Sequence, residues 1–398
     1  MLFPFFSNRT RPLHQTRLLI LGALLLGCRG TVTVGIGASD SDSSVDTSVD
    51  TSVDTSPDTV TISDSATADA GAPDTDPSAR SYILGADVSW IQQDEAQGAT
   101  YYDDGVQKDI FEILTDHAFN FARLWIFVDP SATDGYAENY SEAFGDLPHT
   151  LTMAERIKAA GMGFMLSFQC SDTSASAGSQ IKPSSWEGDD VPGLEQDLYN
   201  HTYDTITALI ANGTPPDIVQ VGNEIGEGFV RPEGTVSDPE TYTALLKAGI
   251  AGVRAADPNI LIALHHQKGR ENETMVAWLE ILLTYEVDFD IIGASTFAET
   301  EEGQYQANFS DLAARYPDHR FLSLAHSGDD IEVIHSVMPS LPDNRGMGAF
   351  IWGPTRYGTS PIFDCQSSCS DEEGSTGGRY DTNDYIDLYP VIAEGLGM

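Results

Sequence analysis

A carboxamide and a carboxylate stand side by side directly after a short apolar run. The run is Asp217–Val221, and Gly222, Asn223 and Glu224 follow it. A glutamate whose surroundings keep it protonated at neutral pH can donate its proton to the leaving oxygen of a glycosidic bond. The amide of Asn223 can hydrogen-bond a sugar hydroxyl group near the reacting carbon. These two residue types at the end of a buried strand therefore favour acid/base chemistry on a sugar chain.

The position of this pair decides between that interpretation and a simpler one. Asn272-Glu273 repeats the dipeptide in a polar stretch that opens a predicted helix, and we assign it no function. A capping or solvated pair is the alternative interpretation of Asn223 and Glu224. Their place at the end of the fourth strand-like run favours a functional role, because the site of a parallel α/β barrel lies where its strands end.

Short apolar runs alternate with amphipathic patterns from Ser81 to Met398. The eight strand-like runs are Tyr82–Val88, Asn120–Ile126, Gly163–Phe168, Asp217–Val221, Ile260–Leu264, Phe289–Ala294, Arg320–Ala325 and Gly348–Trp352, with helical patterns such as Leu194–Ile210, Tyr242–Ala256 and Thr274–Tyr285 between them. This alternation predicts an α/β fold, a (β/α)8 TIM barrel. A doubly wound open sheet is the alternative, but Ala86–Trp90 is not the glycine-rich phosphate turn typical of that fold.

The first 28 residues have the pattern of a secretory signal peptide. Three arginines precede the apolar run Leu18–Leu26, which is shorter than the ~20 residues that span a bilayer. Leu25–Cys28 resembles a bacterial lipobox, in which Cys28 is acylated and becomes the mature N-terminus. We therefore expect an exported lipoprotein, anchored at the cell envelope or cell surface. An ordinary cleaved signal with an incidental cysteine is the alternative.

Residues 29–80 are predicted to form a disordered Ser/Thr/Asp-rich linker ahead of the domain at residues 81–398. The motif Ser-Val-Asp-Thr occurs three times in succession from Ser44 to Thr55. No aromatic residue, Lys or Arg lies between Ser39 and Pro77, so the segment cannot bury enough apolar surface to offset its chain entropy. Such a segment suits a tether that holds a domain away from a membrane, and a plain interdomain linker is the alternative.

Charge and cysteine content exclude several classes of partner. The formal net charge of −41 argues against nucleic acid and anionic membrane surfaces as partners, so we expect membrane contact through the lipid anchor only.

Cys365 and Cys369 are close in sequence and predict a small loop disulfide, which leaves Cys170 unpaired. No Cys/His spacing indicates a zinc site, and we expect no cofactor.

Further motifs occur in the order of one known enzyme family across nearly the whole domain. They are Leu84–Ser89, Tyr102–Gly105, Ala122–Leu124, Asp129-Pro130, Ser171-Asp172, Lys182–Trp186, Gln220–Glu224, Leu245–Gly249 and Asp290–Gly293. With them the domain resembles the arabinogalactan endo-β-1,4-galactanases of glycoside hydrolase family 53. The Gly-Asn-Glu strand end and the Gly-Ala-Asp opening are the most specific matches. The resemblance implies a TIM-barrel hydrolase whose substrate is β-galactan or a related polysaccharide.

The resemblance also implies roles for single residues. Glu224 is the expected general acid/base, and Arg123 is expected to support the catalytic carboxylates from the end of the second strand. The remaining expected substrate-binding residues are Asn223, Asp87, Trp186, His265 and Trp352. Tryptophan faces bury the apolar side of a sugar ring, and core packing is the alternative for Trp186 and Trp352.

The sequence departs from the family pattern around the expected cleft. Retaining glycosidases need a second carboxylate as nucleophile, ~5–5.5 Å from the acid. The family carries a Glu for this purpose at the end of the seventh strand, before a Thr. Here the run is Leu322–Gly328, and His326 is predicted to stand in the nucleophile position. The segments Ser167–Cys170, Thr173–Ser176 and Ser295–Phe297 also lack residues that the family has near the cleft.

Two hypotheses follow for the function. The first is a glycoside hydrolase that cleaves β-galactan with Glu224 as acid/base, and with Asp329, Asp330 or an activated water in place of the nucleophile. The second is a catalytically impaired barrel that binds glycans as a surface lipoprotein. Calcium is conceivable in the acidic loop after the eighth strand, at Asp364 and residues 371–373, but a solvated loop is the simpler interpretation.

Overall fold

The computed structural model describes residues 82–297, 302–356, 360–367 and 377–398. The predicted signal peptide, Cys28 and the linker lie outside the described residues, as do Cys369 and the acidic residues 371–373. Cys170 is free and buried, as expected, and Cys365 is disulfide-bonded. The proposed pairing of Cys365 with Cys369 stays a prediction. Among the described residues, no helix is both long and apolar enough to cross a membrane.

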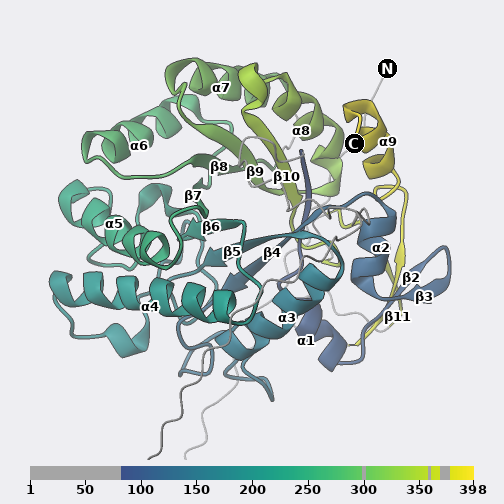
Figure 1. The fold of residues 1–398 in the computed structure, drawn as a ribbon, viewed down its shortest axis with the longest axis horizontal. Coiled ribbons are helices and arrows are strands. Elements are labelled where there is room, and N and C mark those ends of the chain that lie inside the picture. The colour runs from purple at the N-terminus through teal and green to yellow at the C-terminus, as the bar shows by residue number, and fades with distance from the viewer. Residues whose placement is uncertain (1–81, 298–301, 357–359, 368–376) are drawn as a thin grey trace, which may run out of the picture. The chain divides into compact units, whose positions relative to one another are not determined.

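Eight parallel strands close into a barrel, which confirms the predicted fold (Figure 1). The strands are β1 (Ile83–Asp87), β4 (Phe121–Ile126), β5 (Gly163–Phe168), β6 (Ile218–Val221), β7 (Leu261–His266), β8 (Ile291–Ser295), β9 (Arg320–His326) and β10 (Gly346–Ile351). Each pairs with its neighbour in chain order, and β10 closes the barrel against β1. All eight lie within about two residues of the predicted runs.

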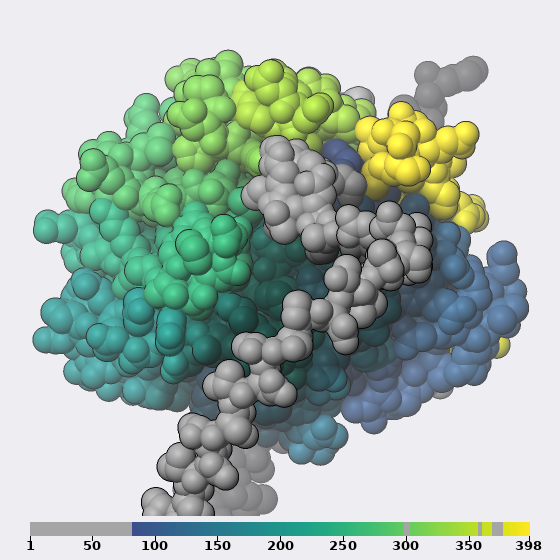
Figure 2. Space-filling model, in the orientation of Figure 1, coloured from purple at the N-terminus to yellow at the C-terminus, as the bar shows by residue number. Residues whose placement is uncertain are grey.

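Helices cover the outside of the barrel, and in the space-filling view α4 to α7 form the teal and green rim on one side (Figure 2). They are α1 (Ile91–Ala96), α2 (Ile110–Asp116), α3 (Leu147–Ala159), α4 (Val191–Ala211), α5 (Pro239–Ala256), α6 (Asn272–Thr284), α7 (Glu302–Arg315), α8 (Ile331–Val337) and α9 (Leu388–Leu396). Aspartates cap several N-termini. Asp190 accepts from the backbone of Gly193 and Asp238 from that of Thr241, which fixes where α4 and α5 begin.

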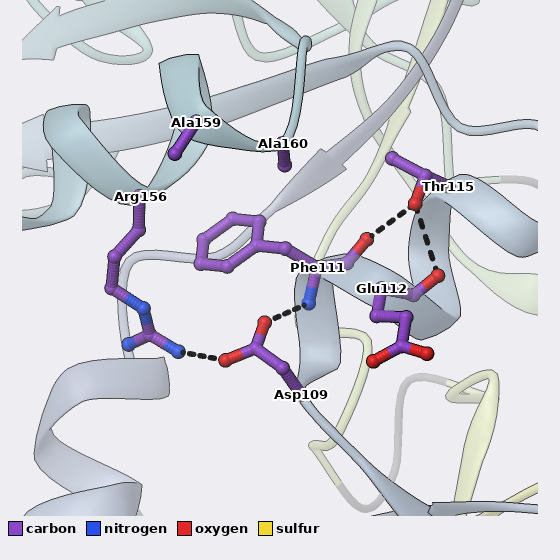
Figure 3. Close-up of a pocket in the computed structure, with 7 residues that line it drawn as sticks. All are labelled: Asp109, Phe111, Glu112, Thr115, Arg156, Ala159 and Ala160. Carbon is purple, nitrogen blue, oxygen red and sulfur yellow. Dashed lines mark hydrogen bonds and ion pairs between the residues drawn. The ribbon is translucent and has the colours of Figure 1, made fainter.

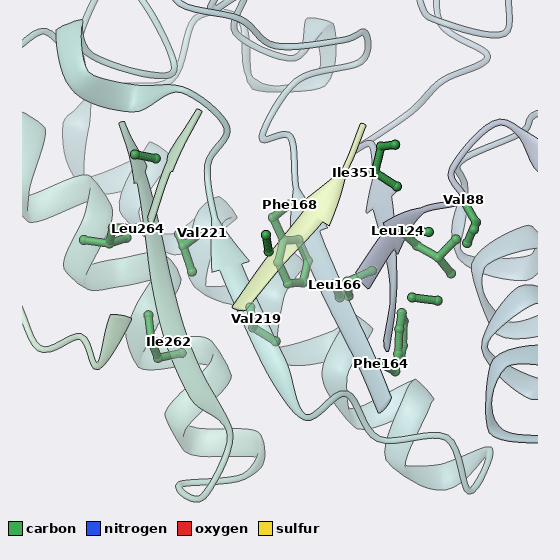
Figure 4. Close-up of a cluster of buried hydrophobic side chains, with 14 of the residues drawn as sticks. Val88, Leu124, Phe164, Leu166, Phe168, Val219, Val221, Ile262, Leu264 and Ile351 are labelled. Carbon is green, nitrogen blue, oxygen red and sulfur yellow. The ribbon is translucent and has the colours of Figure 1, made fainter. Parts of the chain in front are cut away.

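Alternation along the strands divides the barrel residues between two apolar clusters. Inward side chains, among them Phe121, Met165 and Phe350, fill the barrel interior. Outward side chains, such as Leu166 and Val221, pack beneath the helices in a larger cluster (Figure 4). Successive residues of a strand point to opposite faces of the sheet. The inward side chains at the carboxyl ends of the strands therefore line the site.

A second, four-stranded sheet lies outside the barrel, in the order β11-β12-β2-β3. Its strands are β2 (Thr100–Asp103), β3 (Val106–Lys108), β11 (Phe363–Ser367) and β12 (Arg379–Thr382). It joins the first part of the domain to the last, and the yellow β11 lies close to the blue β2 and β3 (Figure 1). This sheet was not predicted from the sequence. All four strands are short, and β3 and β11 are largely exposed, so the sheet gives no clear hydrophobic period in the sequence.

Candidate active site

The backbone after β6 takes an unusual path that places Glu224 above the barrel. Gly222 has φ 76°, and Glu224 itself adopts the left-handed region with φ 53° and ψ 48°. A non-glycine residue in this region is held there by its surroundings, and such positions gather at functional sites. Glu224 Oε1 lies within hydrogen-bond distance of the Ser295 hydroxyl, at 2.8 Å, and Oε2 accepts from the backbone N–H of Ala177 at 3.1 Å. The carboxyl group is therefore fixed in position and only partly buried.

Arg123, on β4, is the charged centre of the site. Its guanidinium donates to Asp87 on β1 at 2.8 Å and to the carbonyl of Leu324 on β9 at 3.2 Å. It also donates to Gln220 at 2.9 Å and to Asn223 at 3.0 Å. With a further bond to Ser167 on β5 at 3.3 Å, this one side chain connects five barrel strands or their ends, and it lies beside the strand end that carries Glu224. Asp87 was predicted to bind the substrate, but it is 2% exposed and its carboxylate holds Arg123, which places it beneath the site and not in the cleft.

Asn223 and His265 complete the polar floor of the site. The Asn223 carbonyl oxygen lies 2.9 Å from His265 Nδ1, and His265 Nε2 lies 2.9 Å from the Ser295 hydroxyl. Burial, with the charge of Arg123, lowers the pKa of His265 well below its usual value, so the imidazole is neutral. His265 is 1% exposed. It therefore belongs to the floor beneath the cleft and does not line it.

Aromatic side chains stand on the other side of the barrel mouth. The Trp90 ring packs edge-on against Trp125 and Trp352, with centroid distances of 4.4 and 5.1 Å. Phe297 meets Trp352 at 6.2 Å and is 38% exposed. Trp125 and Trp352 are partly exposed, so their faces suit the apolar side of a sugar. Trp125 was not predicted from the sequence, although it lies two residues after Arg123 and so shares its face of β4.

Trp186 was wrongly predicted to line the cleft. It is 5% exposed and belongs to the outer apolar cluster, where its ring meets His201 of α4 at 6.2 Å. His201 also packs against Phe168, an outward residue of β5. Core packing, the alternative interpretation, is therefore correct for Trp186.

The end of β9 overturns the prediction for His326. Its ring packs against His335 of α8 at 5.7 Å, and its register partner is Ile351, a member of the outer apolar cluster. Residues paired in register point to the same face of a sheet, so His326 points away from the barrel axis. A register shift before Ser295 pairs that residue with Ala325 instead. Because Ser295 bonds Glu224, the residue at the end of β9 that shares the face of Ser295 is Ala325, not His326.

The two aspartates named as substitute nucleophiles are engaged elsewhere. Asp329 accepts hydrogen bonds from Ser360 and Tyr385, in the C-terminal part of the domain. Asp330 is fully buried and accepts from the backbone N–H and the hydroxyl of Ser327, where it forms a capping box. Neither contact joins the network of Glu224. Within the described residues, Asp87 is the acidic side chain bonded into that network, and Arg123 neutralises it.

One hollow in the described part of the domain lies away from Glu224. A shallow hollow between α2 and α3 has Phe111 at its base, with the Arg156 guanidinium 5.0 Å from the ring centroid (Figure 3). Arg156 is paired with Glu95 and Asp109, so its charge is already matched. Across the part of the chain that the structure describes, no group of His, Cys, Asp and Glu is arranged to hold a metal ion.

Comparison with known proteins decides the family. The model of glycosyl hydrolase family 53 matches residues 83–323. The chain belongs to this family. A probable arabinogalactan endo-β-1,4-galactanase A of Aspergillus niger is 28% identical over 326 residues, which cover 72% of this chain and 88% of the relative. An uncharacterized protein from the bgaB 5′ region of Niallia circulans is 32% identical over 303 residues, covering 69% and 77%. By family, the chain is a galactanase-like glycoside hydrolase.

Solved structures of family 53 share the fold. The catalytic domain from Ignisphaera aggregans has a TM-score of 0.69 at 24% identity, covering 78% of this chain and 96% of that one. Fungal β-1,4-galactanases reach a TM-score of 0.66 at 22% identity, covering 77% and 98%. The family 53 sequence match ends at residue 323, two residues before Ala325. The strand end that faces Glu224 therefore lies just beyond the matched segment.

Proposed function

We propose that the barrel mouth binds β-1,4-galactan or a closely related polysaccharide, and that Glu224 is its proton donor. The observation that carries this proposal is the placement of Glu224 at the end of β6, oriented by Ser295 and Ala177 and opposite a wall of partly exposed tryptophans. A hydrolase needs a proton donor at the leaving oxygen and an apolar wall for the sugar ring. Family membership supports the class of substrate.

A second candidate function is glycan binding with little or no turnover. Ala325 favours it, because the β9 residue on the same face as Ser295, the partner of Glu224, carries a methyl group and not the second carboxylate of a retaining hydrolase. The Glu224 site would then recognise the polysaccharide without forming a glycosyl-enzyme intermediate. This candidate shares the substrate of the first and differs from it only in rate.

One experiment separates the two candidates. Purified protein is incubated with β-1,4-galactan, reducing ends are counted, and retention in a galactan-containing gel is measured in parallel. Retention with turnover that Glu224→Gln abolishes supports the hydrolase. Retention without turnover supports the binding protein. Neither retention nor turnover on galactan, with retention on another polysaccharide, would overturn the substrate assignment.

We also propose that the protein is exported and held at the cell envelope by a lipid on Cys28. Three features of the sequence support this proposal: the apolar run Leu18–Leu26, the lipobox-like Leu25–Cys28, and the Ser/Thr/Asp-rich tether that follows. In a bacterial host, the protein is expected to partition into detergent, and Cys28→Ala is expected to prevent this. Wild-type protein that stays in the aqueous phase would contradict the anchor.

A further inference from the structure

Hydrogen bonds around Glu224 form a single chain whose protons can be counted. The chain runs from Glu224 Oε1 to the Ser295 hydroxyl at 2.8 Å, from there to His265 Nε2 at 2.9 Å, and from His265 Nδ1 to Asn223 Oδ1 at 2.9 Å. Serine has one hydroxyl proton, and a neutral imidazole has one N–H. Each link therefore depends on the direction of the next.

The Asn223 end of the chain has a fixed direction. Its amide nitrogen donates to the carbonyl of Ala175 at 2.8 Å, and its oxygen accepts from Arg123 and Gln220 at 3.0 Å each. If the amide were flipped, its NH2 group would face the donors Arg123 and Gln220, and its oxygen would face the carbonyl of Ala175. The oxygen thus faces His265 Nδ1, which must carry the imidazole proton. Gln220 also lies 3.4 Å from Nδ1, but its amide protons have shorter acceptors in Gly222 and Asn223.

A neutral His265 that is protonated at Nδ1 has a bare Nε2. That atom accepts the Ser295 proton, so the Ser295 oxygen is left as an acceptor toward Glu224 Oε1. The link at 2.8 Å is then satisfied when Glu224 carries a proton on Oε1. The other oxygen, Oε2, accepts from Ala177, as the carbonyl oxygen of a carboxylic acid does. With His265 neutral, all four groups are satisfied together only in this arrangement.

We propose that Ser295 and His265 are positioning residues that hold the proton on Glu224 before the sugar binds. This inference rests on the proposed role of Glu224 as proton donor. Asn223 sets the tautomer of His265, His265 turns the Ser295 hydroxyl, and Ser295 then accepts from Glu224. If Glu224 lost its proton, the Ser295 hydroxyl would turn to donate to the carboxylate, and His265 Nε2 would have to donate to Ser295. A neutral His265 would then have an unprotonated Nδ1 facing the oxygen of Asn223. Only a doubly protonated imidazolium would avoid this.

Charged and titratable groups surround this carboxyl group on several strands. Arg123 on β4 opposes a proton on Glu224, and Asp87 on β1 offsets that charge at 2.8 Å. His266, beside His265 on β7, points outward to Trp278, and burial lowers its pKa to about 4. His265 is itself kept neutral by burial and by Arg123. A carboxylic acid at Glu224 thus adds no unmatched charge to the cluster.

The test uses NMR to locate the protons on His265 and Glu224 in the free protein, so it needs no substrate. Nitrogen-15 NMR at pH 7, with His265→Gln used to assign the signal, is expected to show His265 protonated at Nδ1. Carboxyl carbon-13 NMR, assigned with Glu224→Gln, follows the proton on Glu224. Ser295→Ala is expected to weaken that proton's binding about tenfold, on the scale of one hydrogen bond to an ionisable group. Ser295→Thr keeps the hydroxyl and is expected to restore it.

Ser323→Ala is the matched control, because Ser323 is buried nearby on β9 but bonds Thr296 on the outer side. It is expected to leave the Glu224 titration unchanged. An imidazolium, an Nε2–H tautomer, or a Glu224 titration unaffected by Ser295→Ala would overturn the relay. These outcomes do not depend on galactan turnover, so failure of the relay and failure of the proposed function are distinguishable.

Discussion

Ala325 and Ser295 lie opposite each other in the register of β9 and β8, and the Ser295 hydroxyl bonds Glu224. Ala325 therefore lies on the same face of the sheet as Ser295, and its methyl group stands where a retaining glycosidase would need to present its second carboxylate to the proposed acid. His326, the next residue, points to the opposite face and packs on His335. The bulge in β9 thus decides which side chain the site receives.

Ala325→Glu is expected to create or raise hydrolysis of β-1,4-galactan. The new carboxylate would supply the missing nucleophile, and loss of a nucleophile lowers kcat by roughly three orders of magnitude or more. Reducing-end release by native and variant protein measures the change. Ala325→Glu combined with Glu224→Gln is the inactive control. His326→Glu is the matched contrast, because it places a charge in the buried outer layer and is expected to lower stability without raising activity. A gain from His326→Glu alone would contradict this register of β9 against its neighbours.

Small anions are expected to substitute for the missing nucleophile in the native protein. An alanine side chain is smaller than the glutamate of a retaining glycosidase, so we expect azide to take the place of the carboxylate and attack the anomeric carbon as the leaving group departs. With a dinitrophenyl β-1,4-galactobioside, the expected product is the α-configured glycosyl azide, with dinitrophenolate released. Proton NMR identifies the anomeric configuration. The product is expected to be absent with Ala325→Glu, and a β-configured azide from native protein would indicate a different nucleophile.

Trp352→Ala is expected to weaken galactan binding about tenfold, or ~1.4 kcal/mol, through loss of an aromatic face. Its ring packs on Trp90 and Phe297 at the barrel mouth and is partly exposed. Retardation in a galactan gel measures the affinity. Trp186→Phe is the control, because Trp186 lies in the outer core and its replacement is expected to change stability but not affinity. Equal retardation of the Trp352→Ala variant and the native protein would show that Trp352 does not contribute to galactan binding.

Stability is expected to fall as the pH drops from 6.5 toward 4. Burial lowers the pKa of His326 to about 4, against 6.5 for the free side chain. Below pH 6.5 the unfolded chain takes up a proton that the folded chain does not, so the free energy of unfolding decreases by about 2 kcal/mol at pH 5 for this group. Urea unfolding at pH 7 and pH 5 measures the loss. His326→Gln is expected to remove this share, and an unchanged pH dependence would show that His326 does not contribute.

The pattern of apolar runs in the sequence was sufficient to predict the strands of the barrel. Each barrel strand is a short buried run, and composition locates each run within about two residues. Glu224, Asn223 and Arg123 were found because barrel sites lie at strand ends and because their motifs match the family. The outer sheet was not found, since β2 is held against β12 across nearly the whole domain and neither strand has a hydrophobic period.

The direction of side chains at the end of β9 was decided by the tertiary structure alone. Period-two counting along one strand assumes an unbroken ladder, and a bulge shifts every later residue by one face. The bulge is visible only in the pairing of β9 with β8 and β10, which places Ala325 inward and His326 outward. The same holds for Ser295 and His265. Their types are readable in the sequence, but their link to Glu224 exists only because the closed barrel brings β6, β7 and β8 together at one rim.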